Sequence, residues 1–392
     1  MRMFLILLLP LLLVPPLATA AEPAREPDSL TSAEGEKLFQ ESLRKVCAGV
    51  MASKNLQQPF ASDCGPWPGM QVPAASMLGL VLLGEGNTLS KGPHAATLRK
   101  LTTYVRSAGP NPHESIDNYR TWVLSFSLVF LSEIHRITPS HELKKTLEEM
   151  ATKLEAGAYE TGGWGHTLDH ERNKYGAFVA VSIWAAAGLT AAKGQGVEVD
   201  AKKLERQYGW LRKSLNNAAG GSYYTSNSRT LISPGRTAGV IWLLHRWDKT
   251  ASAKQIELGS AFILRHIALT PEGHASGMMN FAWGALAAGE IGEPLAKEFW
   301  TVHTKSIKTA RRGDGAFATQ VWRDISFHES KDTDALEQKQ VTPTADETAG
   351  DNWAAVWMLT AWQSARGKSL LTGQAAKPDA KGKSTGDKAP SP

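Results

Sequence analysis

Two histidines and an aspartate, His166, Asp169 and His170, lie close together directly after a Gly-Gly-Trp turn that ends at Trp164. Imidazole and carboxylate groups at this spacing could bind a metal ion or transfer a proton. Nothing in the segment indicates a helix, so the spacing does not bring the three side chains onto one face. We interpret the segment as a solvated loop and keep it as a candidate ligand-binding site.

Two arginines begin segments that are otherwise apolar. Arg120 and Arg236 each precede a run of residues that should face the protein interior. A buried guanidinium group needs an anionic partner. The sequence favours a structural ion pair for each arginine and leaves an acidic ligand as the alternative.

Further polar candidates lie near the starts of other apolar segments. Asp117 and Asp351 precede such segments, as helix caps do. His274 lies in the turn "PEGHASG", and Tyr175 follows the histidine loop. A glycan lyase uses a tyrosine or histidine base near an arginine, which Tyr175 and Arg236 could supply together with a histidine.

Composition excludes several classes of protein. Lysines and arginines are scattered without a basic stripe, although the formal net charge is +5, so nucleic acid is not an expected partner. With two cysteines in the chain, a zinc site made of several thiolates is excluded. The sequence lacks a P-loop, a dinucleotide fingerprint, a Gly-x-Ser-x-Gly elbow and a His-Glu-x-x-His motif. We expect no metal and no cofactor.

The N-terminal residues have the pattern of a signal peptide. Arg2 precedes the apolar run 4–17, and an Ala-Thr-Ala cleavage site follows. We expect a secreted or periplasmic protein that has lost residues 1–20, begins with a linker over 21–30 and keeps no membrane anchor. Residues 369–392 are rich in Lys, Gly, Ser and Pro and predict a disordered tail.

The two cysteines, Cys47 and Cys64, are close in sequence. In an exported protein this arrangement predicts one disulfide that closes a short loop, with two free thiols as the alternative.

The Gly-x-aromatic turn at Gly162 recurs along the chain, in full or in weaker form. The glycines of these turns lie at positions 65, 109, 162, 221, 273 and 315, so successive turns are 44, 53, 59, 52 and 42 residues apart. Six near-regular units indicate a repeat protein. We expect the glycines to adopt positive φ and the aromatic residues to be buried wedges between hairpins. These wedges are Trp67, Trp164, Tyr223 and Phe317.

Each turn is followed by a nearly all-apolar helix and preceded by an amphipathic one. The predicted apolar helices span 73–84, 118–136, 174–192, 236–247, 277–291 and 352–366. The predicted amphipathic helices span 33–52, 95–107, 140–156, 201–215, 251–267 and 293–310. Helices that are apolar all round belong in a protein interior, whereas amphipathic helices cover a surface.

Six hairpins of this kind predict an all-α fold, a closed α/α toroid of about twelve helices over residues 31–368. The apolar helices would line the inside of the ring, and the loops that enter them would meet at one end, the mouth. Helix N-termini at the mouth favour polar and anionic ligands. The polar insertion 318–349 predicts a mobile loop or lid beside the mouth.

The Gly-x-aromatic turns and the helices "GRTAGVIWLL" and "DNWAAVWMLTAW" resemble the α/α-toroid superfamily of squalene–hopene cyclases and protein prenyltransferases. The resemblance covers nearly the whole mature chain and implies the toroid fold. The motifs that carry the chemistry of those families differ here. Ala158, Asn217 and Arg311 stand where cyclase repeats have glutamine, and the cyclase acid motif is reduced to "DTDA" from Asp332. No cysteine beyond Cys64 could complete a prenyltransferase zinc set.

Three functions remain open at this stage. The first is a binding protein whose mouth holds a small molecule, a glycan or a peptide. The second is a lyase or hydrolase acting on glycans, since other helical toroids carry such enzymes. The third is an isoprenoid cyclase or transferase. A dry aromatic cavity would favour the third function and a wet polar groove the second.

Overall fold

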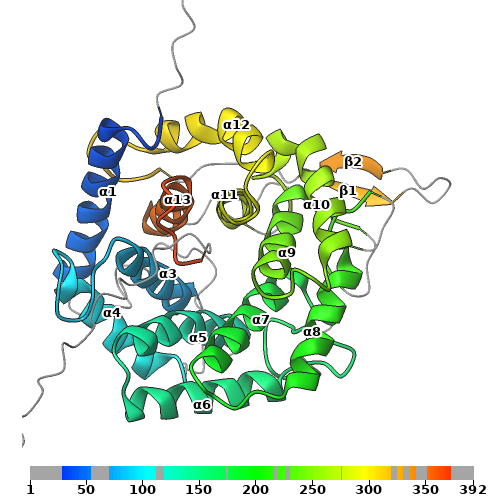
Figure 1. Cartoon of the computed structure of the whole chain (residues 1–392), viewed down its shortest axis with the longest axis horizontal. Coiled ribbons are helices and arrows are strands. Elements are labelled where there is room, and N and C mark those ends of the chain that lie inside the picture. Colours follow the sequence, from blue (N-terminus) through cyan, green and yellow to red (C-terminus); the bar gives the residue numbers. More distant parts are fainter. Residues whose placement is uncertain are drawn as a thin grey trace, which may run out of the picture.

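The computed structural model describes residues 29–53, 70–111, 119–173, 175–215, 219–225, 230–274, 276–318, 325–329, 336–340 and 351–371. Within these ranges, twelve α-helices form an inner and an outer ring (Figure 1). The inner helices are α3 (Gln71–Gly84), α5 (Arg120–Ile137), α7 (Val179–Gly194), α9 (Pro234–Trp247), α11 (Gly277–Ile291) and α13 (Asp351–Ala365). The outer helices are α1 (Ala33–Ala52), α4 (Ala95–Ala108), α6 (His141–Ala156), α8 (Ala201–Ser214), α10 (Ala253–Arg265) and α12 (Leu295–Ala310).

The inner ring is closed. Each inner helix packs against the next one along the chain, and α13 packs against α3. The predicted α/α toroid of six hairpins is therefore confirmed. Every residue from Val72 to Leu83 of α3 is buried, whereas α6 buries one stripe and exposes its charged face. This difference explains why the all-apolar helices lie inside and the amphipathic ones outside.

Several helix boundaries differ from those predicted. Helix α7 begins at Val179 rather than at residue 174, because Phe178 is extended and bridges both Trp164 and Thr225. Helix α10 ends at Arg265, and a short 3-10 helix, η3 (Ile267–Leu269), follows it. The apolar pattern alone does not reveal where a chain leaves a helix to form such bridges.

Some of the turn glycines, but not all, adopt the predicted positive φ. Gly162, Gly273 and Gly315 have φ of +108°, +121° and +85°. Gly109 departs from it, because it caps α4 in a helical conformation with φ of −62°. At Gly221 the positive φ is adopted by its neighbour Gly220. Residue 65 lies outside the described ranges.

Aromatic side chains from four inner helices fill the centre of the ring. Trp184 of α7 lies with its ring centroid 4.2 Å from Phe126 of α5, 5.4 Å from Trp242 of α9 and 6.2 Å from Trp357 of α13. All four side chains are fully buried. At this level the ring encloses packed side chains, as expected for a protein interior.

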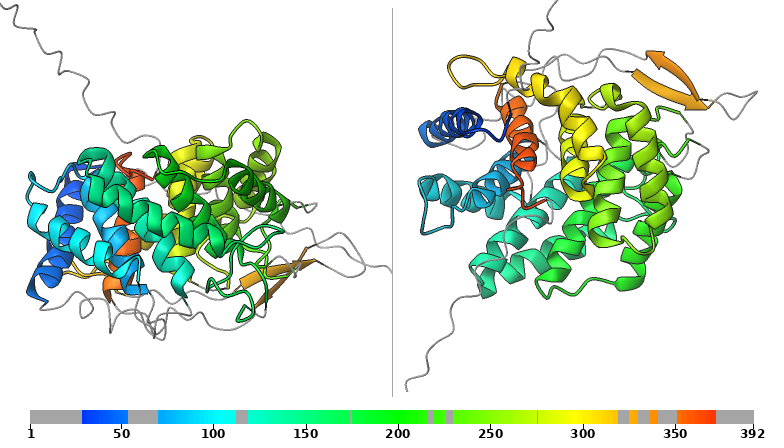
Figure 2. Two further views of the ribbon diagram at one scale, coloured as in Figure 1. Left: turned by 90° about the horizontal axis from the view of Figure 1, so that it is seen from below. Right: turned by 45° about the horizontal axis from the view of Figure 1, so that its top comes forward.

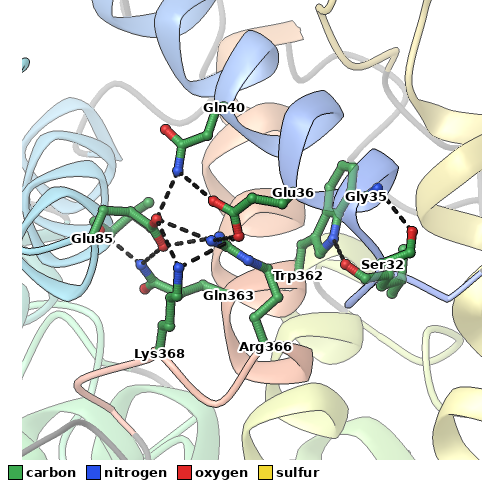
Figure 3. A network of polar contacts seen from close by, with 11 residues as sticks. Ser32, Gly35, Glu36, Gln40, Glu85, Trp362, Gln363, Arg366 and Lys368 are labelled. Atoms are coloured by element: carbon green, nitrogen blue, oxygen red, sulfur yellow. Dashed lines mark hydrogen bonds and ion pairs between the residues drawn. The ribbon is translucent and has the colours of Figure 1, made fainter.

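The first and last hairpins are joined by a cluster of charged and polar side chains, which we call the seam (Figure 3). Arg366, just after α13, donates to Glu85 Oε1 at 2.9 Å and also contacts Glu36 of α1. Gln40 Nε2 donates to Glu85 Oε2 at 2.8 Å, and Gln363 Nε2 to Glu85 Oε1 at 3.0 Å. Because these residues lie on α1 and at the C-terminal ends of α3 and α13, the seam ties the first and last hairpins together.

A second set of contacts closes the ring between α12 and α1. Arg311 donates from Nε to Ser42 at 3.0 Å and from Nη2 to Glu41 at 2.8 Å. Arg311 stands where the cyclase repeats have glutamine, so the departure from that motif has a structural role here.

The end of the ring opposite the mouth is covered by the residues that follow α13. The carbonyl oxygen of Leu371 accepts a hydrogen bond from Trp242 Nε1 at 2.6 Å, and that of Leu370 accepts one from Arg246 at 3.0 Å. Across the described ranges, every helix is too short or too polar to serve as a membrane span.

Part of the predicted lid is a β-hairpin at the edge of the ring (Figure 2). Its strands are β1 (Ile325–Glu329) and β2 (Leu336–Gln340), paired antiparallel. Phe327 exchanges backbone hydrogen bonds with Ile232, and Tyr223 donates to Glu329 Oε1 at 2.5 Å. These contacts fix the hairpin beside the loop that enters α9.

Some predicted features involve residues outside the described ranges. The signal peptide, Trp67 and the "DTDA" segment lie outside, as does Cys64. Cys47 is buried, and burial raises the pKa of its thiol form to about 12. The Cys47–Cys64 disulfide stays a prediction.

Candidate functional site

His166 lies over the start of α5, at the mouth. Its carbonyl oxygen accepts a hydrogen bond from the backbone N–H of Thr121 at 3.2 Å. Its ring nitrogen Nδ1 accepts one from the indole Nε1 of Trp122 at 2.8 Å. The imidazole also lies 4.4 Å from the ring of Phe178 and 5.8 Å from that of Tyr119. We expected an exposed histidine, but the side chain is half-buried among aromatic rings.

The rest of the histidine loop is folded around Asn173. The amide of Asn173 donates to the carbonyl oxygens of Thr167 at 2.8 Å and Asp169 at 3.0 Å. Asp169 is exposed and accepts from the backbone N–H of Glu171. These hydrogen bonds within the loop hold it around Asn173.

His170 is directed away from His166. It stacks on Tyr159 at 4.2 Å, and its Nε2 lies 3.0 Å from the carbonyl oxygen of Gly157. The described ranges contain no group of three or more His, Cys, Asp or Glu side chains arranged to hold a metal. The structure thus separates the three residues that the sequence placed together.

A groove of about 300 Å³ opens next to His166, and we call it the His166 groove. Its lining combines aromatic and polar side chains: Tyr119, His166, Thr167, Arg172, Asn173, Tyr175 and Phe178. Tyr175 is 71% exposed, so its ring projects beyond the rest of the lining. Such a combination is typical of ligand-binding sites, where polar groups orient a ligand held by apolar surfaces.

Beyond the groove, further aromatic rings follow Phe178 toward α11, and we call this line of rings the aromatic row. Phe178 lies 5.3 Å from Tyr224, which lies 4.8 Å from the ring of His274. The guanidinium of Arg236 lies over the Tyr224 ring at 4.7 Å. The mouth therefore carries a line of aromatic rings across the starts of α5, α7, α9 and α11.

Arg236 is almost fully buried, at 1% exposure, and has a structural position. It donates to the carbonyl oxygen of Leu231 at 2.5 Å and to that of His274 at 3.1 Å. Leu231 has a φ of +55°, a conformation that L-residues with large side chains rarely adopt. Arg236 thus links the backbone of Leu231, at the entry to α9, to that of His274, and its guanidinium packs on the Tyr224 ring.

Three predicted site residues remain. Arg120 is the first residue of α5 and is half-buried. Asp117 and the side chain of Asp351 lie outside what the structure describes. The sequence did not single out Trp122 and Phe178, which contact the His166 ring, or Asn173, which bonds to the backbone of Thr167 and Asp169.

Backbone amides at the mouth already have partners in several places. The N–H of Phe178 donates to Trp164, and that of Val179 donates to the carbonyl oxygen of Tyr224 at 3.1 Å. The first turns of α9 and α11 are capped by the hydroxyl groups of Ser233 and Ser276. These bonds reduce the attraction that open helix ends would have for an anion.

The surroundings of His166 disfavour its charged form. Burial lowers the pKa of His166 to about 4, compared with an ordinary value of 6.5. Burial also raises the pKa of the Tyr119 phenol. Both groups are therefore neutral at physiological pH, so the described groove offers neutral hydrogen-bonding groups plus the guanidinium of Arg172.

The low pKa of His166 predicts a pH-dependent stability. Between about pH 6.5 and pH 4 the unfolded chain binds a proton at this histidine and the folded chain does not. The free energy of unfolding should therefore be fully maintained above pH 6.5 and fall toward pH 4. The fall of this pKa from 6.5 to about 4 limits the loss from this residue to about 3.4 kcal/mol.

Urea unfolding of the wild type and of His166→Asn at pH 7.5 and pH 4.5 measures this loss. Asn keeps an acceptor for Trp122 but does not titrate. Burial lowers the pKa of His94, His266 and His303 as well, so the comparison with the variant isolates His166. Equal losses in the two proteins would contradict the assignment.

The closed double ring of helices and its mouth define the chain as an α/α toroid. It belongs to the family described as "Domain of unknown function (DUF6288)", which matches residues 43–345. A comparison with curated proteins finds no match.

The solved structures that share the fold include a terpene cyclase and a mannanase. The type II terpene cyclase MstE from Scytonema, in its apo form, has a TM-score of 0.54 at 12% identity, over 85% of this chain and 99% of the cyclase. An inactive variant of the α-1,6-mannanase GH76A of Salegentibacter sp. HEL1_6, in complex with α-1,6-mannotriose, has a TM-score of 0.55 at 11% identity, over 85% of this chain and 99% of the mannanase. At these identities the likeness concerns the fold alone.

Proposed function

We propose that this protein is exported and binds a glycan at the mouth of the toroid, in the His166 groove. The observation that carries the proposal is the exposed ring of Tyr175 beside the half-buried His166 and Tyr119. A sugar ring has an apolar C–H face and a polar rim of hydroxyl groups. An aromatic platform with neighbouring hydrogen-bonding groups is complementary to both.

The centre of the ring weighs against an isoprenoid ligand. A long hydrocarbon chain needs a dry, deep cavity, but Phe126, Trp184, Trp242 and Trp357 fill the centre. The His166 groove is open and partly polar instead. The shared fold with a terpene cyclase therefore does not favour cyclase chemistry for this chain.

Binding is favoured over hydrolysis by the groups in the groove. Glycosidases need two carboxyl groups at a defined separation. Of the side chains that line the described groove none is a carboxylate, and His166 has too low a pKa for an efficient base near pH 7. The aromatic row toward Tyr224 and His274 would let an oligosaccharide extend beyond one ring.

Thermal unfolding of the mature protein in the presence of ligands tests the proposal. The probes are α-1,6-mannotriose, cello-, xylo- and chito-oligosaccharides, a pool of short peptides and geranylgeranyl diphosphate. At 100 times its dissociation constant, a ligand that binds the folded chain adds about 2.7 kcal/mol of stability. Stabilisation by an oligosaccharide supports the proposal. Stabilisation by the peptides or the diphosphate alone would replace it, and no stabilisation by any glycan would contradict it.

Tyr175→Ala should weaken the binding of the stabilising oligosaccharide by at least about tenfold, equivalent to 1.4 kcal/mol. The exposed ring should contribute little to folding, so the free energy of unfolding should change by less than about 0.5 kcal/mol. Titration calorimetry measures the affinity of the wild type and the variant.

Asp169→Ala is the matched control, since Asp169 belongs to the same loop and does not line the groove. It should bind as the wild type does. Equal affinity in Tyr175→Ala would place the ligand elsewhere.

A further inference from the structure

The contact between Trp122 and His166 has a chemical consequence for the groove. An indole nitrogen carries a hydrogen and can only donate a hydrogen bond. Trp122 Nε1 lies 2.8 Å from His166 Nδ1, so Nδ1 must be the acceptor and cannot carry a proton. In a neutral imidazole the proton is then on Nε2.

We infer that Trp122 is a positioning residue, which fixes His166 as a hydrogen-bond donor through Nε2–H toward an acceptor oxygen of the ligand. The ligand part of this inference rests on the proposed function. The tautomer rests only on the geometry of the two side chains.

The position of the two rings supports the inference. Trp122 is 3% exposed and lies on the third residue of α5, where the helix backbone holds it. The imidazole lies nearly parallel to the indole, with centroids 6.0 Å apart and an angle of 22°. The ring centroid of Phe178 lies 4.4 Å from that of the imidazole. With rings of Trp122 and Phe178 both this near, the imidazole has little freedom to turn.

The other polar groups around His166 are compatible with a neutral imidazole that carries its proton on Nε2. Tyr119 at the start of α5 is held neutral by burial, which raises its pKa. On the loop, Arg172 and Tyr175 line the same groove, and Asp169 lies 4.0 Å from Arg172.

A fixed donor would select the ligand. Nε2–H fits a ring oxygen, a hydroxyl oxygen or a carbonyl oxygen, and it rejects a group that can only donate. His166 would then bind without exchanging a proton, so ligand affinity should stay constant between about pH 5.5 and pH 8.

Nitrogen-15 NMR of the full mature chain tests the tautomer without any ligand. At pH 7 in the wild type, Nε2 of His166 should have the shift of a protonated ring nitrogen and Nδ1 that of an unprotonated one. The reverse pattern, or a fast mixture of the two tautomers, would overturn the inference and leave the proposed function untouched.

Trp122→Phe removes the donor and keeps an aromatic ring at the same place. In this variant His166 should populate both tautomers, and its pKa should rise toward the ordinary value. Phe130→Leu is a matched control that alters buried packing on the same helix about two turns away from Trp122, and it should keep the wild-type tautomer. An unchanged tautomer and pKa in Trp122→Phe would also overturn the inference.

The ligand part is tested with the oligosaccharide that stabilises the protein. Its affinity for the wild type should be constant from pH 5.5 to pH 8, whereas Trp122→Phe should bind several-fold more weakly and lose further affinity toward pH 5.5. A wild-type affinity that changes tenfold over this range would contradict the donor role.

Discussion

Replacing Arg366 by alanine is expected to lower the free energy of unfolding by about 3–5 kcal/mol, because the change leaves Glu85 buried without its main counter-charge. The side chains of Arg366 and Glu85 are only 3% and 5% exposed. The guanidinium also lies 4.0 Å from the centroid of Phe39, so packing is lost as well as charge. Urea unfolding at pH 7.5 measures the effect.

Two further variants separate the causes. Arg106→Ala removes an exposed pair with Glu142, whose side chains are 47% and 77% exposed, and should cost less than about 1 kcal/mol. Arg366→Met combined with Glu85→Gln removes both charges of the buried pair and should recover part of the lost stability. If Arg366→Ala is no more harmful than Arg106→Ala, the seam does not hold the ring closed.

The seam also has a defined response to acid. Burial raises the pKa of Glu36, but hydrogen bonds from Gln40 and Arg366 and the charges of Arg366 and Lys368 outweigh it and bring the pKa below its ordinary value. A carboxyl group of this kind stabilises the folded chain above its unfolded pKa, and this stabilisation is lost as the pH falls through the folded value. Glu36 is 42% exposed, so solvent screening keeps its contribution small.

Trp164→Ala should destabilise the protein by about 3–5 kcal/mol, because it leaves a cavity between α6 and α7. Trp164 is fully buried. Its indole donates to the carbonyl oxygen of Leu154 at 2.8 Å, and its backbone N–H donates to the Ser182 hydroxyl at 2.9 Å. Thermal or urea unfolding measures the change.

Trp164→Phe is the matched control, which keeps most of the ring and loses the indole hydrogen bond. It should cost clearly less than Trp164→Ala, with about 1 kcal/mol assigned to the lost hydrogen bond. Should the alanine variant unfold like the wild type, Trp164 would not be a wedge between α6 and α7.

The architecture could be predicted from the sequence because the pattern of apolar residues that distinguishes an inner from an outer helix is contained within each helix. An all-apolar helix such as α3 and an amphipathic helix such as α6 differ within a few turns of the chain. Trp164 and Phe317 are fully buried, as expected for wedges, whereas Tyr223 is only half-buried because it reaches out to Glu329 on β1.

The site was less predictable because its contacts join distant residues. Trp122 in an apolar helix has the pattern of a core residue, and its bond to His166 spans 44 positions of sequence. The short spacing of His166, Asp169 and His170 suggested a shared site, but Asn173 folds the loop so that His170 is directed to Tyr159 instead. The composition of the loop alone does not contain this geometry.

The most direct test of a glycan site at the mouth is a crystal structure of the mature protein with the oligosaccharide that stabilises it most. We predict a sugar ring against Tyr175, with a ligand oxygen within hydrogen-bonding distance of His166 Nε2. A ligand held instead in the groove of about 570 Å³ between α1 and the start of α13, lined by Lys45, Gly49 and Asn352 among others, would contradict the account.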